Sequence, residues 1–155
     1  YWEAFLSELG AEYRYSTDAQ KFHKYKGRIG RHLELARRVA HQSTFEGPRH
    51  GAVLVRGSAV INVSENKKNF CSFGDRFRKC DIQPGHSTVH AELGSILGID
   101  RRKTEGAEVY VARVGKRGDF KMSKPCPMCE SALRHVGVKR VIYTIDEETA
   151  GSYKL

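Results

Sequence analysis

Two short motifs carry side chains that could bind a metal ion and move a proton: His90-Ala91-Glu92 and Pro125-Cys126-Pro127-Met128-Cys129. Each motif stands at the start of a segment with helical periodicity. Cysteines three positions apart at a helix start project from the same face, and the helix dipole there favours the thiolate form that binds metals. With His90 as a third ligand, Cys126 and Cys129 would leave the fourth tetrahedral position of a zinc ion open. An open position is typical of a catalytic zinc site rather than a structural one.

Glu92 is the candidate for moving protons at such a site. It follows His90 by two positions, so on a helix its side chain does not share the direction of the histidine and can face a water on the metal. A zinc-bound water loses its proton near neutral pH, and the resulting hydroxide is a strong nucleophile. We therefore predict zinc hydroxide as the nucleophile and Glu92 as the proton shuttle, passing the proton to a ring nitrogen and then to a leaving amine.

The order H-x-E followed by P-C-x-x-C is the signature of zinc nucleobase deaminases. From about Arg31 to Ile145 the sequence resembles the zinc-dependent cytidine and deoxycytidylate deaminase superfamily. The resemblance implies an α/β fold, a three-layer α/β/α sandwich around a central five-stranded mixed sheet. It also implies that His90, Cys126 and Cys129 bind Zn²⁺ and that Glu92 is catalytic.

The same resemblance implies contacts with the substrate at Asn66, Ala91 and Pro125. Asn66 follows the predicted hairpin, where relatives commonly place an asparagine that touches the sugar or the base. Asn62 and Asn69 lie close by, and each of these asparagines could instead be a turn residue.

The function that follows is a hydrolytic deaminase converting cytosine to uracil in a nucleoside or a nucleotide such as deoxycytidylate. The alternative is a cytosine or adenine deaminase that edits single-stranded DNA, RNA or tRNA. Residues 67–79 interleave cations with aromatic rings, which suits a single-stranded nucleic acid, although the rings could instead anchor a loop on the core.

Other interpretations of the cysteines remain open. Cys126 and Cys129 alone could be a redox pair, which would leave His90-Ala91-Glu92 unexplained. Cys71 and Cys80 could complete an all-thiolate structural zinc site, or could bind a second, regulatory metal together with His86. The chain could also be a nucleic-acid-binding module that keeps zinc only as a structural relic.

The hydrophobic periodicity predicts the elements that must position these residues. Residues 21–31 are expected to be turn-rich, residues 64–87 to form a long loop, and residues 115–118 to form a turn. The segment 115–124 is longer and more basic than the connection between the same strand and helix in many relatives. We therefore expect the edge of the pocket to differ from that of these relatives. The short C-terminal segment, residues 146–155, favours a final antiparallel hairpin. The expected helices cover 1–9, 33–40, 89–97 and 128–136, and the expected strands cover 51–55, 59–63, 108–114, 140–145 and 152–155.

Length and composition suit one domain over 1–155, with a lead-in over 1–30 and a catalytic core over 31–155. The 155 residues carry a net charge of +9, which favours phosphate-bearing partners. No apolar run approaches the roughly 20 residues of a membrane span, so we expect no membrane partner. Four cysteines are too few for a disulfide scaffold. We expect a trimmed chain without a secretory signal, an intracellular, cytoplasmic location, and possible assembly into a homo-oligomer.

Overall fold

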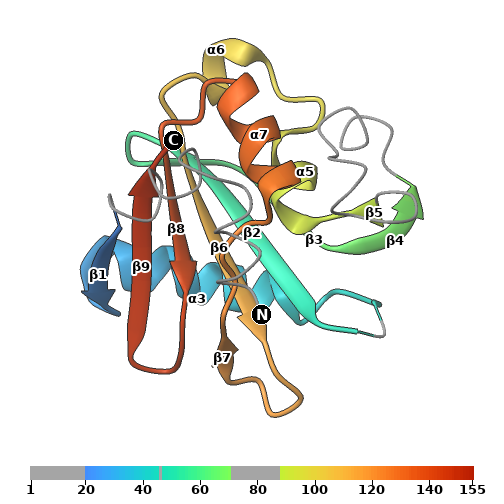
Figure 1. The fold of residues 1–155 in the computed structure, drawn as a ribbon, viewed down its shortest axis with the longest axis vertical. Coiled ribbons are helices and arrows are strands. Elements are labelled where there is room, and N and C mark those ends of the chain that lie inside the picture. The colour runs from blue at the N-terminus through green and yellow to red at the C-terminus, as the bar shows by residue number, and fades with distance from the viewer. Residues whose placement is uncertain (1–19, 46, 71–87) are drawn as a thin grey trace, which may run out of the picture.

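The computed structural model describes residues 20–45, 47–70 and 88–155 (Figure 1). The helix expected over 1–9 lies outside these ranges. Along the chain the elements are β1 (Lys21–Lys24), α3 (Gly27–Ala40), β2 (Arg49–Arg56), β3 (Ala59–Glu65), β4 (Lys67–Phe70), β5 (Thr88–Val89), α5 (Ala91–Ile96), α6 (Arg101–Thr104), β6 (Glu108–Val114), β7 (Phe120–Lys121), α7 (Pro127–His135), β8 (Arg140–Thr144) and β9 (Thr149–Lys154).

The main sheet is mixed and has the order β1-β9-β8-β6-β2-β3, with β7 added on β6. Strands β6 and β8 run parallel, whereas β2 pairs antiparallel with both β3 and β6. The final hairpin, β8 and β9, is antiparallel as predicted. Helix α3 covers one face of the sheet, and α5 and α7 lie on the other (Figure 1). The predicted three-layer α/β/α sandwich is therefore confirmed.

The expected number of strands was wrong, because the main sheet has seven strands within the described ranges rather than five. One addition is β1, whose sequence Lys-Phe-His-Lys carries no apolar alternation, so only its backbone pairing with β9 makes it a strand. The other is β7, which forms because the inserted segment 115–124 folds back and pairs with the end of β6. Strand β4 also lies inside the predicted loop 64–87, where it pairs with β5.

Two apolar layers hold the sandwich together. The α3 side of the sheet buries Leu33, Val53 and Tyr110 in one cluster. The opposite side buries Leu54 and Leu133 in a larger cluster that includes the first turn of α7. Alternate residues of β2 enter the two layers, as expected for a strand covered on both faces.

Gly51 sets the distance between α3 and the sheet. A Cβ at this position would lie 2.1 Å from the carbonyl oxygen of Ala36 and 2.6 Å from the amide nitrogen of Ala40. Only a residue without a side chain allows the helix backbone to approach β2 this closely. This close packing fixes the position of β2. The same strand carries His50, the residue before Gly51, which faces the site described below.

We expect Gly51→Ala to destabilise the protein by about 3 kcal/mol, because a methyl group would overlap helix backbone that cannot move alone. For a chain of this size the melting temperature should fall by about 6 to 12 °C in a thermal scan. Gly57→Asn is the control. Its φ of +64° suits asparagine, and a Cβ there meets no atom within 4 Å. An unchanged melting temperature for Gly51→Ala would contradict the close-packing argument.

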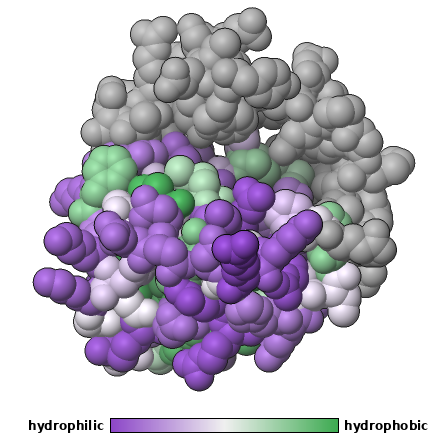
Figure 2. All heavy atoms as spheres, turned by 90° about the horizontal axis from the view of Figure 1, so that it is seen from below, coloured by the Kyte–Doolittle hydropathy of each residue, from purple (hydrophilic) through white to green (hydrophobic). Residues whose placement is uncertain are grey.

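The surface seen from below in Figure 2 is mostly hydrophilic, in keeping with the excess of lysine and arginine. Isolated apolar side chains remain exposed within the described ranges, for example Phe22 on β1 and Met122 after β7. None of the helices in the described part of the chain combines the length and the apolar character that a membrane crossing requires.

Candidate active site

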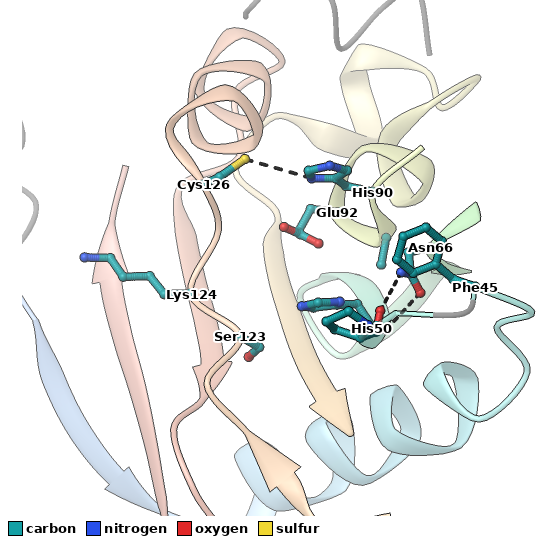
Figure 3. Close-up of a pocket in the computed structure, with 10 residues that line it drawn as sticks. Phe45, His50, Asn66, His90, Glu92, Ser123, Lys124 and Cys126 are labelled. Atoms are coloured by element: carbon teal, nitrogen blue, oxygen red, sulfur yellow. Dashed lines mark hydrogen bonds between the residues drawn. The ribbon is translucent and has the colours of Figure 1, made fainter. Parts of the chain in front are cut away.

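The two motifs predicted from the sequence meet at the starts of two helices. His90 is the N-cap residue of α5, and Cys126 is the N-cap residue of α7. Cys129 lies in the first turn of α7, which begins with Pro127 at a position where proline costs no hydrogen bond. Helices α5 and α7 contact each other, so the two N-termini converge. Segments 36 residues apart in the chain are thereby brought together (Figure 3).

The three candidate ligand atoms form a compact triangle. His90 Nδ1 lies 3.2 Å from Cys129 Sγ and 3.9 Å from Cys126 Sγ, and the two sulfurs are 3.6 Å apart. A tetrahedral zinc with bonds of about 2.0 Å to nitrogen and 2.3 Å to sulfur would separate its ligand atoms by about 3.5 to 3.8 Å. The triangle therefore fits the metal, and these three residues are positioned to bind it.

The electrostatics of the triangle also suit a cation. A hydrogen bond from Cys129 lowers the pKa of Cys126 well below its usual range, against the effect of burial. Burial raises the pKa of Cys129, so that thiol keeps the proton that a metal would displace. Burial alone would lower the pKa of His90, but the hydrogen bond with Cys126 and the charges of Glu92 and Cys126 raise it overall. The site thus already concentrates negative charge around the histidine.

Glu92 lies beside the triangle at a cavity of about 270 Å³. Only 5% of the glutamate is exposed. Figure 3 shows its carboxylate pointing into the space between the His90 and Cys126 pair and His50. His90, Ala91 and Cys126 line the same cavity. A buried carboxylate beside a candidate metal site, facing an open cavity, has the placement that proton transfer to a bound molecule requires.

Asn66 also lines the cavity, but its side chain is largely engaged by the protein. Its Oδ1 accepts the His50 amide at 2.9 Å and lies 2.7 Å from the Ser43 hydroxyl, and its Nδ2 donates to the Pro48 carbonyl at 2.8 Å. These bonds use one of the two N–H groups of the side-chain amide. Pro125 is buried directly before Cys126 and does not line the cavity.

Sequence reasoning missed several residues of the cavity wall. The wall also includes Phe45, Pro48, His50, Ser123 and Lys124. Lys124 extends away from the cavity in Figure 3, and its Nζ lies 5.3 Å from the centre of the Tyr153 ring. The Ser123 hydroxyl bonds across β6 and β8, donating to the Val111 carbonyl at 2.9 Å and accepting the Thr144 amide at 2.8 Å. Of these residues, His50 is the one that the sequence could have indicated, because it is a polar residue on a buried strand, at a position that faces the pocket.

Several predicted features lie outside the described residues. Cys71, Cys80 and His86 are among them, so the alternative metal sites built from them stay predictions. So does most of the basic segment 67–79. Lys67 itself is on β4, where its Nζ is 3.9 Å from Glu65. The redox-pair interpretation left His90 unexplained, whereas in the structure His90 contacts both sulfurs.

Comparison with known proteins gives the site its family. Residues 28–145 match the family described as the cytidine and deoxycytidylate deaminase zinc-binding region. This match includes both motifs and all of the elements between α3 and β8. A deoxycytidylate deaminase of Mycobacterium phage D29 is 30% identical over 125 residues, which cover 72% of this chain and 89% of the relative.

Solved structures with similar folds include two deaminases. A dCMP deaminase from the cyanophage S-TIM5, in its apo form, has a TM-score of 0.49 and 20% identity, covering 74% of this chain and 80% of that chain. A cytidine deaminase from Mycobacterium tuberculosis has a TM-score of 0.48 and 18% identity, covering 79% of this chain and 92% of that chain.

Proposed function

The chain belongs to the cytidine and deoxycytidylate deaminase family of zinc-dependent hydrolytic enzymes, and on this premise we propose that it converts deoxycytidylate to deoxyuridylate. One water molecule is consumed and one ammonia is released for each cytosine. The single observation that carries the proposal is that Glu92 lies at one cavity with His90 and Cys126, two of the three side chains positioned to bind a metal.

In this proposal His90, Cys126 and Cys129 hold the zinc ion, which when bound makes water acidic enough to act as a nucleophile near neutral pH. Glu92 takes a proton from the attacking water and delivers it to the ring nitrogen beside the amine-bearing carbon. The same carboxylate then takes the second proton from the hydroxyl now on that carbon and passes it to the amine, so that ammonia leaves as the carbonyl of uracil forms. Because Glu92 is shielded from bulk solvent, its proton passes to the substrate rather than exchanging with the surroundings.

The remaining wall would hold the base in place. Phe45 and Pro48 offer apolar surface to the ring faces, and Ala91 is a small residue next to the metal ligand, which leaves room for the base. Holding the base with its amine-bearing carbon toward the metal end replaces a bimolecular encounter by a positioned reaction. The support for deoxycytidylate in particular is the phage relative of that name and the net charge of +9, which favours a phosphate-bearing substrate.

The test is ammonia release from a panel of deoxycytidylate, deoxycytidine, cytidylate, adenosine and a cytosine-containing single-stranded oligonucleotide. We expect deoxycytidylate to have the highest kcat/KM, at least about 10-fold above deoxycytidine, because a phosphate contact with a cation is worth about 1.5–3 kcal/mol. Its KM should respond weakly to added salt, since few phosphate contacts are made.

A different pattern would replace the proposal. Preferred turnover of the oligonucleotide, with affinity falling steeply as salt is added, would indicate the polynucleotide deaminase considered from the sequence. Turnover of adenosine alone would exclude cytosine as the base.

A further inference from the structure

His50 is a polar residue of the cavity wall to which the proposed chemistry assigns no task. Its neighbours on β2 show where it points. Gly51 and Val53 face α3, whereas Ala52 and Leu54 pack in the layer shared with α5 and α7. Alternation therefore directs His50 to the α5 side. Figure 3 shows its ring on the opposite side of Glu92 from His90 and Cys126.

The backbone of His50 is held on both sides by Asn66. The main-chain N–H of His50 donates to the side-chain Oδ1 of Asn66 at 2.9 Å. The main-chain N–H of Asn66 donates to the main-chain carbonyl of His50 at 3.2 Å. Asn66 Nδ2 also donates to the Pro48 carbonyl at 2.8 Å. These bonds fix the strand end that carries the imidazole, so the ring is presented to the cavity in a defined position.

The hydrogen bonding of the ring decides what it offers a ligand. The ring bonds the main chain of Pro48, and because proline has no N–H, the Pro48 carbonyl accepts and the imidazole donates. Burial lowers the pKa of His50, as do Arg113 and His90, while Glu92 and the Pro48 bond raise it. The net shift is downward, so the ring is neutral near pH 7. A neutral imidazole that donates from one nitrogen is an acceptor at the other.

An acceptor at this wall needs a donor on the substrate. The amine-bearing carbon of the base belongs at the metal end, and the ring nitrogen that carries the sugar is directly opposite it in a pyrimidine. The sugar therefore belongs toward the end of the cavity where His50 and Asn66 lie. Apart from the reacting amine, the one donor that deoxycytidylate has left at neutral pH is its 3′-hydroxyl.

We propose that His50 accepts a hydrogen bond from the 3′-hydroxyl of the substrate sugar and so determines specificity for free mononucleotides. The inference rests on the proposed function. Inside a DNA strand the 3′-oxygen is esterified and has no proton to donate, so the same contact disfavours polynucleotides. The contact thus gives a physical reason for a preference for mononucleotides over polynucleotides.

The test compares deoxycytidylate with 2′,3′-dideoxycytidylate, which lacks only that hydroxyl, on the zinc-loaded wild-type enzyme and on His50→Phe. Wild type should lose about 10-fold or more in kcat/KM with the dideoxy substrate, because a buried acceptor is left unpaired. His50→Phe keeps a planar ring without the acceptor. Its kcat/KM on deoxycytidylate should fall by about the same factor, and it should discriminate between the two nucleotides by less than about 3-fold.

His41→Leu, at the exposed end of α3, is the matched control and should discriminate as wild type does. Equal turnover of the two nucleotides by wild type would overturn the inference without any variant, and so would undiminished discrimination in His50→Phe. Either result leaves the deaminase activity standing. Absence of ammonia from both nucleotides would instead overturn the proposed function, and the inference with it.

Discussion

Replacing Glu92 with glutamine should lower kcat on deoxycytidylate by at least about 10³-fold while leaving the metal and the fold in place. Glutamine has nearly the shape of glutamate and can still hydrogen-bond, but it cannot accept and return a proton. Because Glu92 is outside the ligand triangle, zinc content measured by elemental analysis should stay near one per chain. The measurement is steady-state ammonia release together with zinc stoichiometry and a thermal scan.

Glu108→Gln is the matched control, because Glu108 is also a buried carboxylate, 9% exposed, but lies outside the cavity. It sits 3.9 Å from Arg28 and 3.8 Å from Arg140, so its loss should cost some stability and leave turnover within about 3-fold. Full activity in Glu92→Gln would remove this residue from the chemistry.

Replacing Cys129 with serine should abolish both zinc binding and turnover. A serine hydroxyl does not ionise near neutral pH, so one thiolate of the triangle is lost and the two remaining ligands cannot hold the ion tightly. Zinc content should fall below about 0.1 per chain, and a chelator that lowers the melting temperature of wild type should leave that of Cys129→Ser unchanged.

The same measurements on wild type decide between one metal and two. A zinc content near one per chain would exclude the second site considered for Cys71, Cys80 and His86. Cys71→Ser, as the control, should then keep its zinc.

Because zinc must displace the proton that burial retains on Cys129, the apparent affinity of the protein for zinc should also rise with pH. Retention of one zinc and of turnover in Cys129→Ser would refute the ligand set.

The features of this protein that depend on local spacing could be predicted from the sequence. The metal triangle was indicated by a histidine and two cysteines at helix starts, and the nearby proton carrier by a glutamate two positions after the histidine. The structure brings these residues together at the N-termini of α5 and α7. The β2–β3 hairpin and the helices of both faces followed from apolar periodicity. Such patterns act over a few residues, so they are visible along a single chain.

The features that depend on partners far away in the chain could be found only in the folded structure. Strand β1 exists because its backbone pairs with β9, across more than 120 residues, and its own side chains carry no strand pattern. The sequence allowed Asn66 to be a turn residue or a substrate contact, and only the structure shows that its side chain bonds the His50 main-chain N–H and the Pro48 carbonyl. Backbone pairing and side-chain hydrogen bonds between distant segments produce no periodic pattern in the sequence. The two bonded groups can be separated by any number of residues, so neither one indicates where its partner lies.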